Sequence, residues 1–430
     1  MRIKELNPLI NFKMAALTML GVSVFFFLAP SHEKIGISFL VASLLISAMI
    51  RRDEATIVRF GYLISAICLT FFWLPMFGYG GWKTYLIVYA GAFLAGYSIF
   101  YNKHDLRPTF IFVFFLPWML HILIGVLQIA NHLINFDALN IQHLLVSSRS
   151  SLSIGVKYYS AVISLVITSS FVFFSMNKNT SWKYIFALLL LMLGLIDNRV
   201  ALISVSITII AFYLEFGMRF RWTRAANYIF LAMIAFAVVL ALIVYSPRLL
   251  LGYESIVASL NFQEYQSWKD NGLFLNEFCE GNGAKCMVDQ SIFYRLSWLF
   301  WGGIVVYDNP MGIGFGAGPL DRALQLYGMH ISKNLERDFH SEFMNIAVIF
   351  GAPGVLLFFG SFSLFFCALK KKIRVEDSRN RVGLGLAYAF FILLFLRLLI
   401  ESVGGVGMYV FLFMLLAAIA AEANRAFKPT

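Results

Sequence analysis

The sequence has 430 residues, of which 60% are hydrophobic and 13% charged, with a mean hydropathy of +0.78 and a net charge of +11. Because soluble domains carry about a quarter charged residues, this composition excludes an ordinary water-soluble protein. The positive charge is typical of basic cytoplasmic loops in a membrane protein, and we expect no nucleic-acid partner.

The apolar residues form continuous runs of roughly 20 residues, the length that a helix needs to cross a membrane. Barrel strands would instead alternate over about ten residues. We therefore predict an all-α, polytopic membrane protein of about 12 transmembrane helices, in a single integral membrane domain, residues 1–430. The predicted spans are 11–30, 35–50, 57–77, 83–101, 108–131, 153–175, 182–196, 200–216, 226–246, 342–369, 382–400 and 405–422.

The first span lacks a small-residue cleavage site, so we expect a retained helix rather than a signal peptide. Lys and Arg gather in alternate connections, including Arg51-Arg52 and the run from Lys370 to Arg374. Because cytoplasmic loops are rich in these residues, both termini are predicted to be cytoplasmic. The long connection 247–341, between spans nine and ten, is then a partly helical loop on the outer face.

Cys279 and Cys286 lie in this long connection, in the segment CEGNGAKC. A cysteine pair that flanks a Gly/Asn turn in an oxidising compartment indicates a local disulfide. The alternatives are two free thiols or a metal site. No His or further Cys stands nearby to complete zinc ligation, so we favour the disulfide and expect no metal.

Residues 291–306 predict a helix that lies along the membrane surface or dips into it. Pro310 and the glycines after it end this helix. The glycine run MGIGFGAGPL contains Gly314 and Gly316, and such a run lets the backbone approach a ligand closely. It is either a phosphate cradle or a simple re-entrant turn. No GK[ST] follows and no strand precedes it, so neither a Walker loop nor a dinucleotide loop fits.

Two arginines stand among apolar residues toward the predicted outer face. Arg199 lies between two apolar runs, where it either meets an anionic partner or reaches lipid headgroups. Arg295 lies on the aromatic-rich helix SIFYRLSWLFW. Its guanidinium suits bidentate phosphate binding, and the alternative is contact with lipid phosphate. Both residues are candidates for binding an anionic substrate.

His340 stands just before the tenth predicted span, in ERDFHSEFMN. A histidine there can act as a base or hold a diphosphate near neutral pH, and the alternative is a structural residue at a helix start. Glu342 suits the first turn of that helix. Arg397 and Glu401 are four residues apart, which predicts an ion pair on one helix face.

These elements together form a pattern: an arginine in an outer loop, a second arginine before W…NPxGxGxG, and a histidine followed by a small polar residue before the next span. The pattern resembles the O-antigen ligase and polymerase superfamily, bacterial glycosyltransferases with a multi-spanning C-type fold. The resemblance covers the late loop and the layout of nearly the whole chain. Ser341 stands where many members have Asn.

The resemblance implies that Arg199 and Arg295 hold the diphosphate of an undecaprenyl-diphosphate-linked glycan donor. It implies that His340 assists attack by an acceptor hydroxyl, with Gly314, Gly316 and Glu342 as possible support. Members are described as needing no metal, and we expect no cofactor. Membrane lipids are expected partners. The implied location is the bacterial inner membrane, with the active site facing the periplasm.

Several activities fit this pattern. A ligase transfers O-antigen polysaccharide to lipid A-core, a polymerase extends one lipid-linked glycan with another, and a protein O-oligosaccharyltransferase modifies Ser or Thr. The segment PLDRALQLYGMHISKN resembles ligases of enteric type, so we favour the ligase. Twelve spans would also fit a lipid or glycan transporter, but the candidate residues gather toward one face instead.

Overall fold

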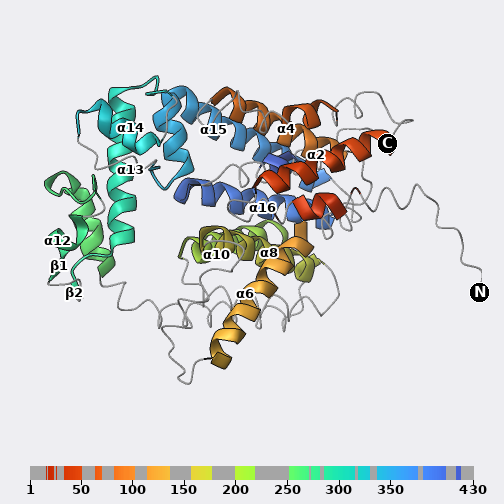
Figure 1. The fold of residues 1–430 in the computed structure, drawn as a ribbon, viewed down its shortest axis with the longest axis horizontal. Coiled ribbons are helices and arrows are strands. Elements are labelled where there is room, and N and C mark those ends of the chain that lie inside the picture. Colours follow the sequence, from red (N-terminus) through yellow and green to blue (C-terminus); the bar gives the residue numbers. More distant parts are fainter. Residues whose placement is uncertain are drawn as a thin grey trace, which may run out of the picture. The chain divides into compact units, whose positions relative to one another are not determined.

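A computed structural model describes the following residues of the chain: scattered positions between 16 and 26, then 33–50, 63–69, 82–101, 114–135, 156–176, 199–217, 251–270, 273–280, 285–314, 318–329, 337–375, 381–402 and 413–417. In these residues the fold is all-α, with a single two-residue β-ladder (Figure 1). The chain divides into two compact units. The first comprises Met1–Arg221, Phe365–Leu394 and Gly404–Thr430, and the second comprises Trp222–Leu364 and Phe395–Val403.

The first unit consists of apolar helices whose bounds follow the predicted spans closely. They are α2 (Glu33–Ile50), α4 (Trp82–Tyr101), α6 (Leu116–Asn135), α8 (Val156–Met176) and α10 (Arg199–Phe212), which continues as the π-helical turn η4 (Tyr213–Gly217). The predicted spans 182–196 and 226–246 lie outside the described residues. Those at 11–30, 57–77 and 405–422 are described only in part, as helical residues.

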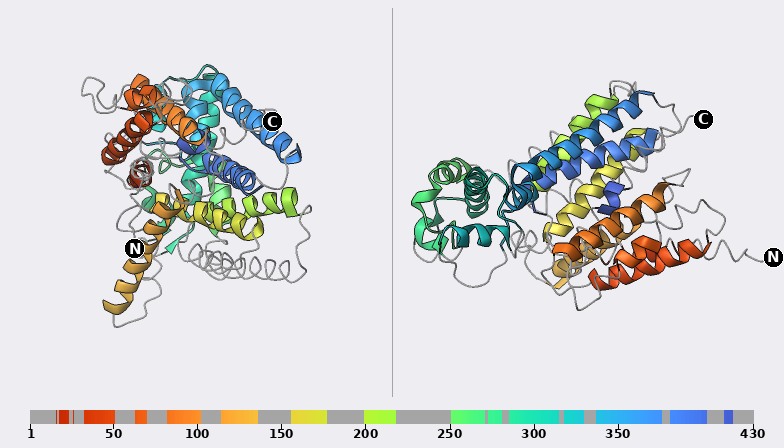
Figure 2. Two further views of the ribbon diagram at one scale, coloured as in Figure 1. Left: turned by 90° about the vertical axis from the view of Figure 1, so that its right-hand side faces the viewer. Right: turned by 90° about the horizontal axis from the view of Figure 1, so that it is seen from above.

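Helix α8 forms the core of this first unit. Its residues 159–173 are buried throughout, and α8 packs against α6 and α10 (Figure 2). Two of the serines that interrupt its apolar sequence, Ser164 and Ser169, each donate to the carbonyl four residues earlier, at 2.7 Å. Polar residues are therefore tolerated inside an apolar helix because the helix backbone accepts from them.

The second unit contains most of the long connection predicted at 247–341, which is largely helical where it is described. After a helical segment at 251–260 come the 3-10 turn η5 (Phe262–Glu264), α12 (Phe274–Phe278), β1 (Cys279–Glu280), β2 (Lys285–Cys286), α13 (Gln290–Asp308) and α14 (Pro319–Leu326). The unit also holds the start of α15 (Glu342–Val375) and the end of α16 (Arg381–Ile400).

Helix α13 begins at a capped position. The Asp289 side chain accepts from the Ile292 N–H at 3.1 Å, which satisfies one of the free amides of the first turn. Ser255 accepts the Asp289 N–H at 2.8 Å, and Ser259 donates to the Phe293 carbonyl at 3.3 Å. The small residues of segment 251–260 thus hold this segment against the start of α13.

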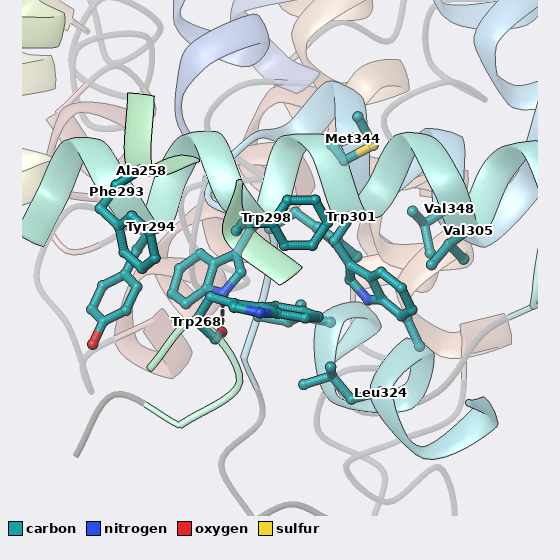
Figure 3. Packing of buried hydrophobic residues seen from close by; sticks show 14 of the residues in the cluster. Ala258, Trp268, Phe293, Tyr294, Trp298, Trp301, Val305, Leu324, Met344 and Val348 are labelled. Carbon is teal, nitrogen blue, oxygen red and sulfur yellow. Dashed lines mark hydrogen bonds between the residues drawn. The ribbon is translucent and has the colours of Figure 1, made fainter. Parts of the chain in front are cut away.

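A cluster of aromatic side chains forms the core of the second unit (Figure 3). Trp268 and Trp298 are 1% and 2% exposed. The Trp298 indole N–H donates to the Trp268 carbonyl at 2.7 Å, and the rings of Trp268 and Trp301 lie 5.3 Å apart. Large aromatic rings bury much apolar surface each, so α13 is fixed along its length by its own tryptophans.

A buried ion pair ties α14 to the residues that lead into α15. Asp321 on α14 accepts from the Arg337 Nε at 2.7 Å and from the Arg337 backbone N–H at 2.8 Å. The same guanidinium donates to the Lys269 carbonyl at 2.7 Å. Both side chains are about nine-tenths buried. These contacts hold Arg337 in place, and Arg337 lies three residues before His340.

The glycine run after α13 packs against a break in α15. Gly351, inside α15, has φ 65° and ψ −151°, which interrupts the helix there. The Gly314 N–H donates to the Ile349 carbonyl at 3.0 Å, and the Ala352 N–H donates to the Pro310 carbonyl at 2.7 Å. An added Cβ at Gly312 would collide with the Ile349 carbonyl, so this close backbone crossing requires glycine.

Two described helices are long and apolar enough to cross a membrane, Glu342–Lys371 and Val382–Ile400. Their aromatic residues pair along both: Phe362 lies 5.0 Å from Phe395 within the second unit, and Phe366 lies 5.9 Å from Phe391 within the first. Shorter apolar helices are found at Ile35–Ala48, Ala90–Ile99, Leu116–Gln128, Tyr159–Phe173 and Val200–Phe216.

Cys279 and Cys286 form a disulfide across the β1–β2 ladder, in which they are direct partners. Replacing Cys279 with Ser should destabilise the second unit by about 2 kcal/mol, because a short loop closed by a disulfide constrains the unfolded chain only modestly. Thermal unfolding of the purified protein, with and without reductant, checks this expectation. Reductant should lower the Tm of the wild type and leave that of the variant unchanged. Equal Tm values for all samples would contradict it.

Candidate functional site

His340 occupies an unusual backbone conformation directly before α15. Its φ is 53°, and it is the one non-glycine residue with positive φ in the described part of the chain. Left-handed backbone disfavours most side chains, although Asn, Asp and His visit it more often. The Asp338 carboxylate stabilises this conformation because its Oδ1 accepts the His340 N–H at 2.8 Å. The ring is therefore presented by a turn of fixed shape rather than by a helix.

The imidazole of His340 lies flat on an aromatic surface. Its ring stacks on Trp298, with centroids 5.2 Å apart and an interplanar angle of 16°. Trp298 in turn stacks on Tyr294, at 5.3 Å and 6°. The His340 side chain remains 45% exposed, and its Nδ1 lies 3.7 Å from the Asp338 carboxylate. One face of the ring is thus held by stacking, while the side chain still reaches solvent.

Arg295 lies on α13 and is half-buried. Residues three apart on a helix lie about 5–6 Å from one another at Cβ, so Arg295 is a close neighbour of Trp298, the residue that stacks on His340. His340 therefore packs against the stretch of α13 that carries Arg295, and both residues are candidates from the sequence.

Tyr294 completes the stack beneath His340 as an uncharged residue. Burial raises the pKa of its hydroxyl to about 12, with a smaller contribution from the carboxylates of Glu277 and Asp270. The phenol stays neutral across the physiological range. It therefore adds no negative charge to this part of α13.

The start of α15 fixes the residues around His340. Ser341 caps the helix, since its Oγ accepts the Met344 N–H at 3.2 Å. The Asn345 side chain accepts the Phe339 N–H at 3.0 Å. Glu342 is buried in the first turn. The residue is 8% exposed, so little of it reaches solvent.

Gly314, the candidate residue of the glycine run that the structure describes, has a structural role. The Gly314 N–H is already donated to Ile349, so it cannot cradle a phosphate at the same time. Gly316 lies outside the described residues. Of the two interpretations left open, the described part of the run favours the turn that packs on α15.

Arg199 is the first residue of α10, at the start of the helix that matches the predicted span 200–216. It belongs to the first compact unit, whereas Arg295 and His340 belong to the second. Its side chain lies outside what the structure describes, so its role as a diphosphate ligand stays a prediction from the resemblance.

Sequence reasoning missed two residues that shape the site. Asp338 sets the turn of His340, and its signal is an acidic residue two positions before the histidine, as in side-chain turns that mimic a backbone turn. Trp298 supplies the stacking surface, and no local pattern marks it among the other tryptophans. Within the described ranges, no group of three or more His, Cys, Asp or Glu could hold a metal ion.

No protein-family model matches the chain, and a search of curated proteins finds no match either.

Proposed function

We propose that this protein is a glycosyltransferase of the bacterial inner membrane. It transfers O-antigen polysaccharide from undecaprenyl diphosphate to lipid A-core on the periplasmic face, as an O-antigen ligase does. The observation that carries the proposal is His340. It is a partly exposed imidazole in a left-handed turn, stacked on Trp298, which lies one helical turn from Arg295 on α13.

The proposed reaction is one displacement at the anomeric carbon of the donor sugar. A hydroxyl of lipid A-core attacks this carbon, a new C–O bond forms, and the bond to the diphosphate oxygen breaks. His340 takes the hydroxyl proton as a general base. The leaving undecaprenyl diphosphate gains negative charge, which the guanidinium of Arg295 stabilises. No oxidant, reductant or metal is needed to balance this step.

Two further observations support the location. The Cys279–Cys286 disulfide fits an oxidising compartment such as the periplasm. The basic run from Lys370 to Arg374 stands at the opposite end of α15 from His340, and basic residues favour the cytoplasmic side. Together with about 12 apolar runs of membrane length in the sequence, this supports a multi-pass protein with its candidate site facing outward.

Deletion of the gene, followed by gel analysis of lipopolysaccharide, tests the proposal in the source bacterium. A ligase predicts that full-length glycan accumulates on undecaprenyl diphosphate while lipid A-core carries none. An O-antigen polymerase, the alternative with the same donor and the same kind of site, predicts a single repeat unit on lipid A-core. A banding pattern equal to that of the wild type would contradict both and favour protein glycosylation or transport. Complementation with the intact gene is the control.

A further inference from the structure

The two residues that follow His340 are attached to the end of α16. The Ser341 hydroxyl donates to the Leu399 carbonyl at 2.8 Å, and the Glu342 N–H donates to the Glu401 carbonyl at 3.3 Å. Leu399 and Glu401 belong to the same compact unit as His340. The turn that presents the imidazole is thus held from outside by two backbone carbonyls.

Arg397 and Glu401 fix the end of α16 in turn. Their side chains form an ion pair four residues apart, and they are 10% and 8% exposed. The Glu401 N–H also closes the last turn by donating to the Arg397 carbonyl at 2.7 Å. Removing one partner of a buried pair leaves an uncompensated buried charge, so this turn would have to rearrange.

We propose that the Arg397–Glu401 pair is a positioning element for His340. The pair holds the last turn of α16, the carbonyls of this turn hold Ser341 and Glu342, and these two residues hold the left-handed turn of His340. Neither Arg397 nor Glu401 touches substrate in this scheme. The catalytic consequence of the inference rests on the proposed function, whereas its structural part does not.

The structural part is tested by hydrogen exchange on the purified full-length protein in lipid nanodiscs. Glu401→Gln should speed exchange of the amides at 339–345 by about tenfold or more, while those at 290–308 stay unchanged. Arg397→Lys keeps the charge and should give an intermediate effect; it also serves if Glu401→Gln does not fold. Glu215→Gln is the matched control. It removes a carboxylate that faces Lys370 at 3.5 Å in the other unit and should leave 339–345 unchanged. Wild-type exchange at 339–345 in both site variants would overturn the proposal.

The catalytic part is tested by transfer from undecaprenyl-diphosphate-linked O-antigen to purified lipid A-core. Glu401→Gln should lower kcat about 100-fold, because a small displacement of a catalytic group costs that much, with little change in KM for the donor. The exchanged pair Arg397→Glu with Glu401→Arg should restore part of the rate. Faster exchange with an unchanged kcat would overturn the positioning role. A wild-type protein that transfers nothing would defeat the proposed function alone, and the exchange result would still decide the structural part.

Discussion

Replacing His340 with Asn is expected to reduce glycan transfer by about a thousandfold, within the range that a positioned general base contributes. Asn is the informative substitution because it tolerates the left-handed backbone of His340 better than Ala does. The fold should therefore survive while the titratable nitrogen is lost. The measurement is the transfer rate of purified protein, alongside its thermal unfolding.

The control for this substitution is His330→Asn, since no role is assigned to that histidine. His340→Ala should reduce transfer to a similar extent, and it should also lower the Tm slightly because Ala fits the left-handed region poorly. Transfer at the wild-type rate in His340→Asn, with normal unfolding, would remove His340 from the chemistry. The Asp338 turn and the Trp298 stack would then be purely structural.

Arg295→Ala should lower transfer by about 100-fold to a thousandfold, because it removes a fixed cation from the departing diphosphate. Arg295→Lys should recover only part of this loss, since an ammonium group cannot form the two parallel hydrogen bonds of a guanidinium. The rate measured against donor concentration checks both variants. KM for the lipid-linked donor should rise in each.

Lys269→Ala provides the matched control for Arg295. Lys269 is a half-buried cation of the same compact unit, and its ammonium group donates to the Gln266 side chain at 3.0 Å. Its loss should leave kcat and KM near the wild-type values. Equal losses in the Arg295 and Lys269 variants would indicate a general effect of positive charge rather than a specific diphosphate ligand.

Local patterns in the sequence predicted the helices and the short-range pairs. The continuous apolar run predicted at 382–400 corresponds to α16, and the aromatic run at 291–306 corresponds to α13. The Arg397–Glu401 pair follows from helical spacing. These features could be read because each depends on residues within one or two turns of each other.

The remaining features of the site depend on contacts between segments that are distant in the sequence. Such contacts cannot be predicted from the spacing of residues in a single sequence. Asp321 selects Arg337 among several basic residues of the loop, and Trp298 meets His340 only after α13 and α15 come together. Ser341 stands just before the tenth predicted span, and the structure adds that its hydroxyl donates to the Leu399 carbonyl on α16. Such pairings are decided by packing, so no spacing rule could have named them.

The crossing of the glycine run with α15 has a consequence for how this protein can change. Gly312 and Gly351 face each other's backbone, and an added Cβ at Gly351 would strike the Pro310 carbonyl. Neither position can take a larger residue while the backbone on the other side of the crossing stays where it is. A substitution at either glycine therefore requires the opposite backbone segment to move. A viable replacement at one glycine should come with a compensating substitution in the backbone segment that crosses it. A selection for suppressor mutations would reveal that second substitution.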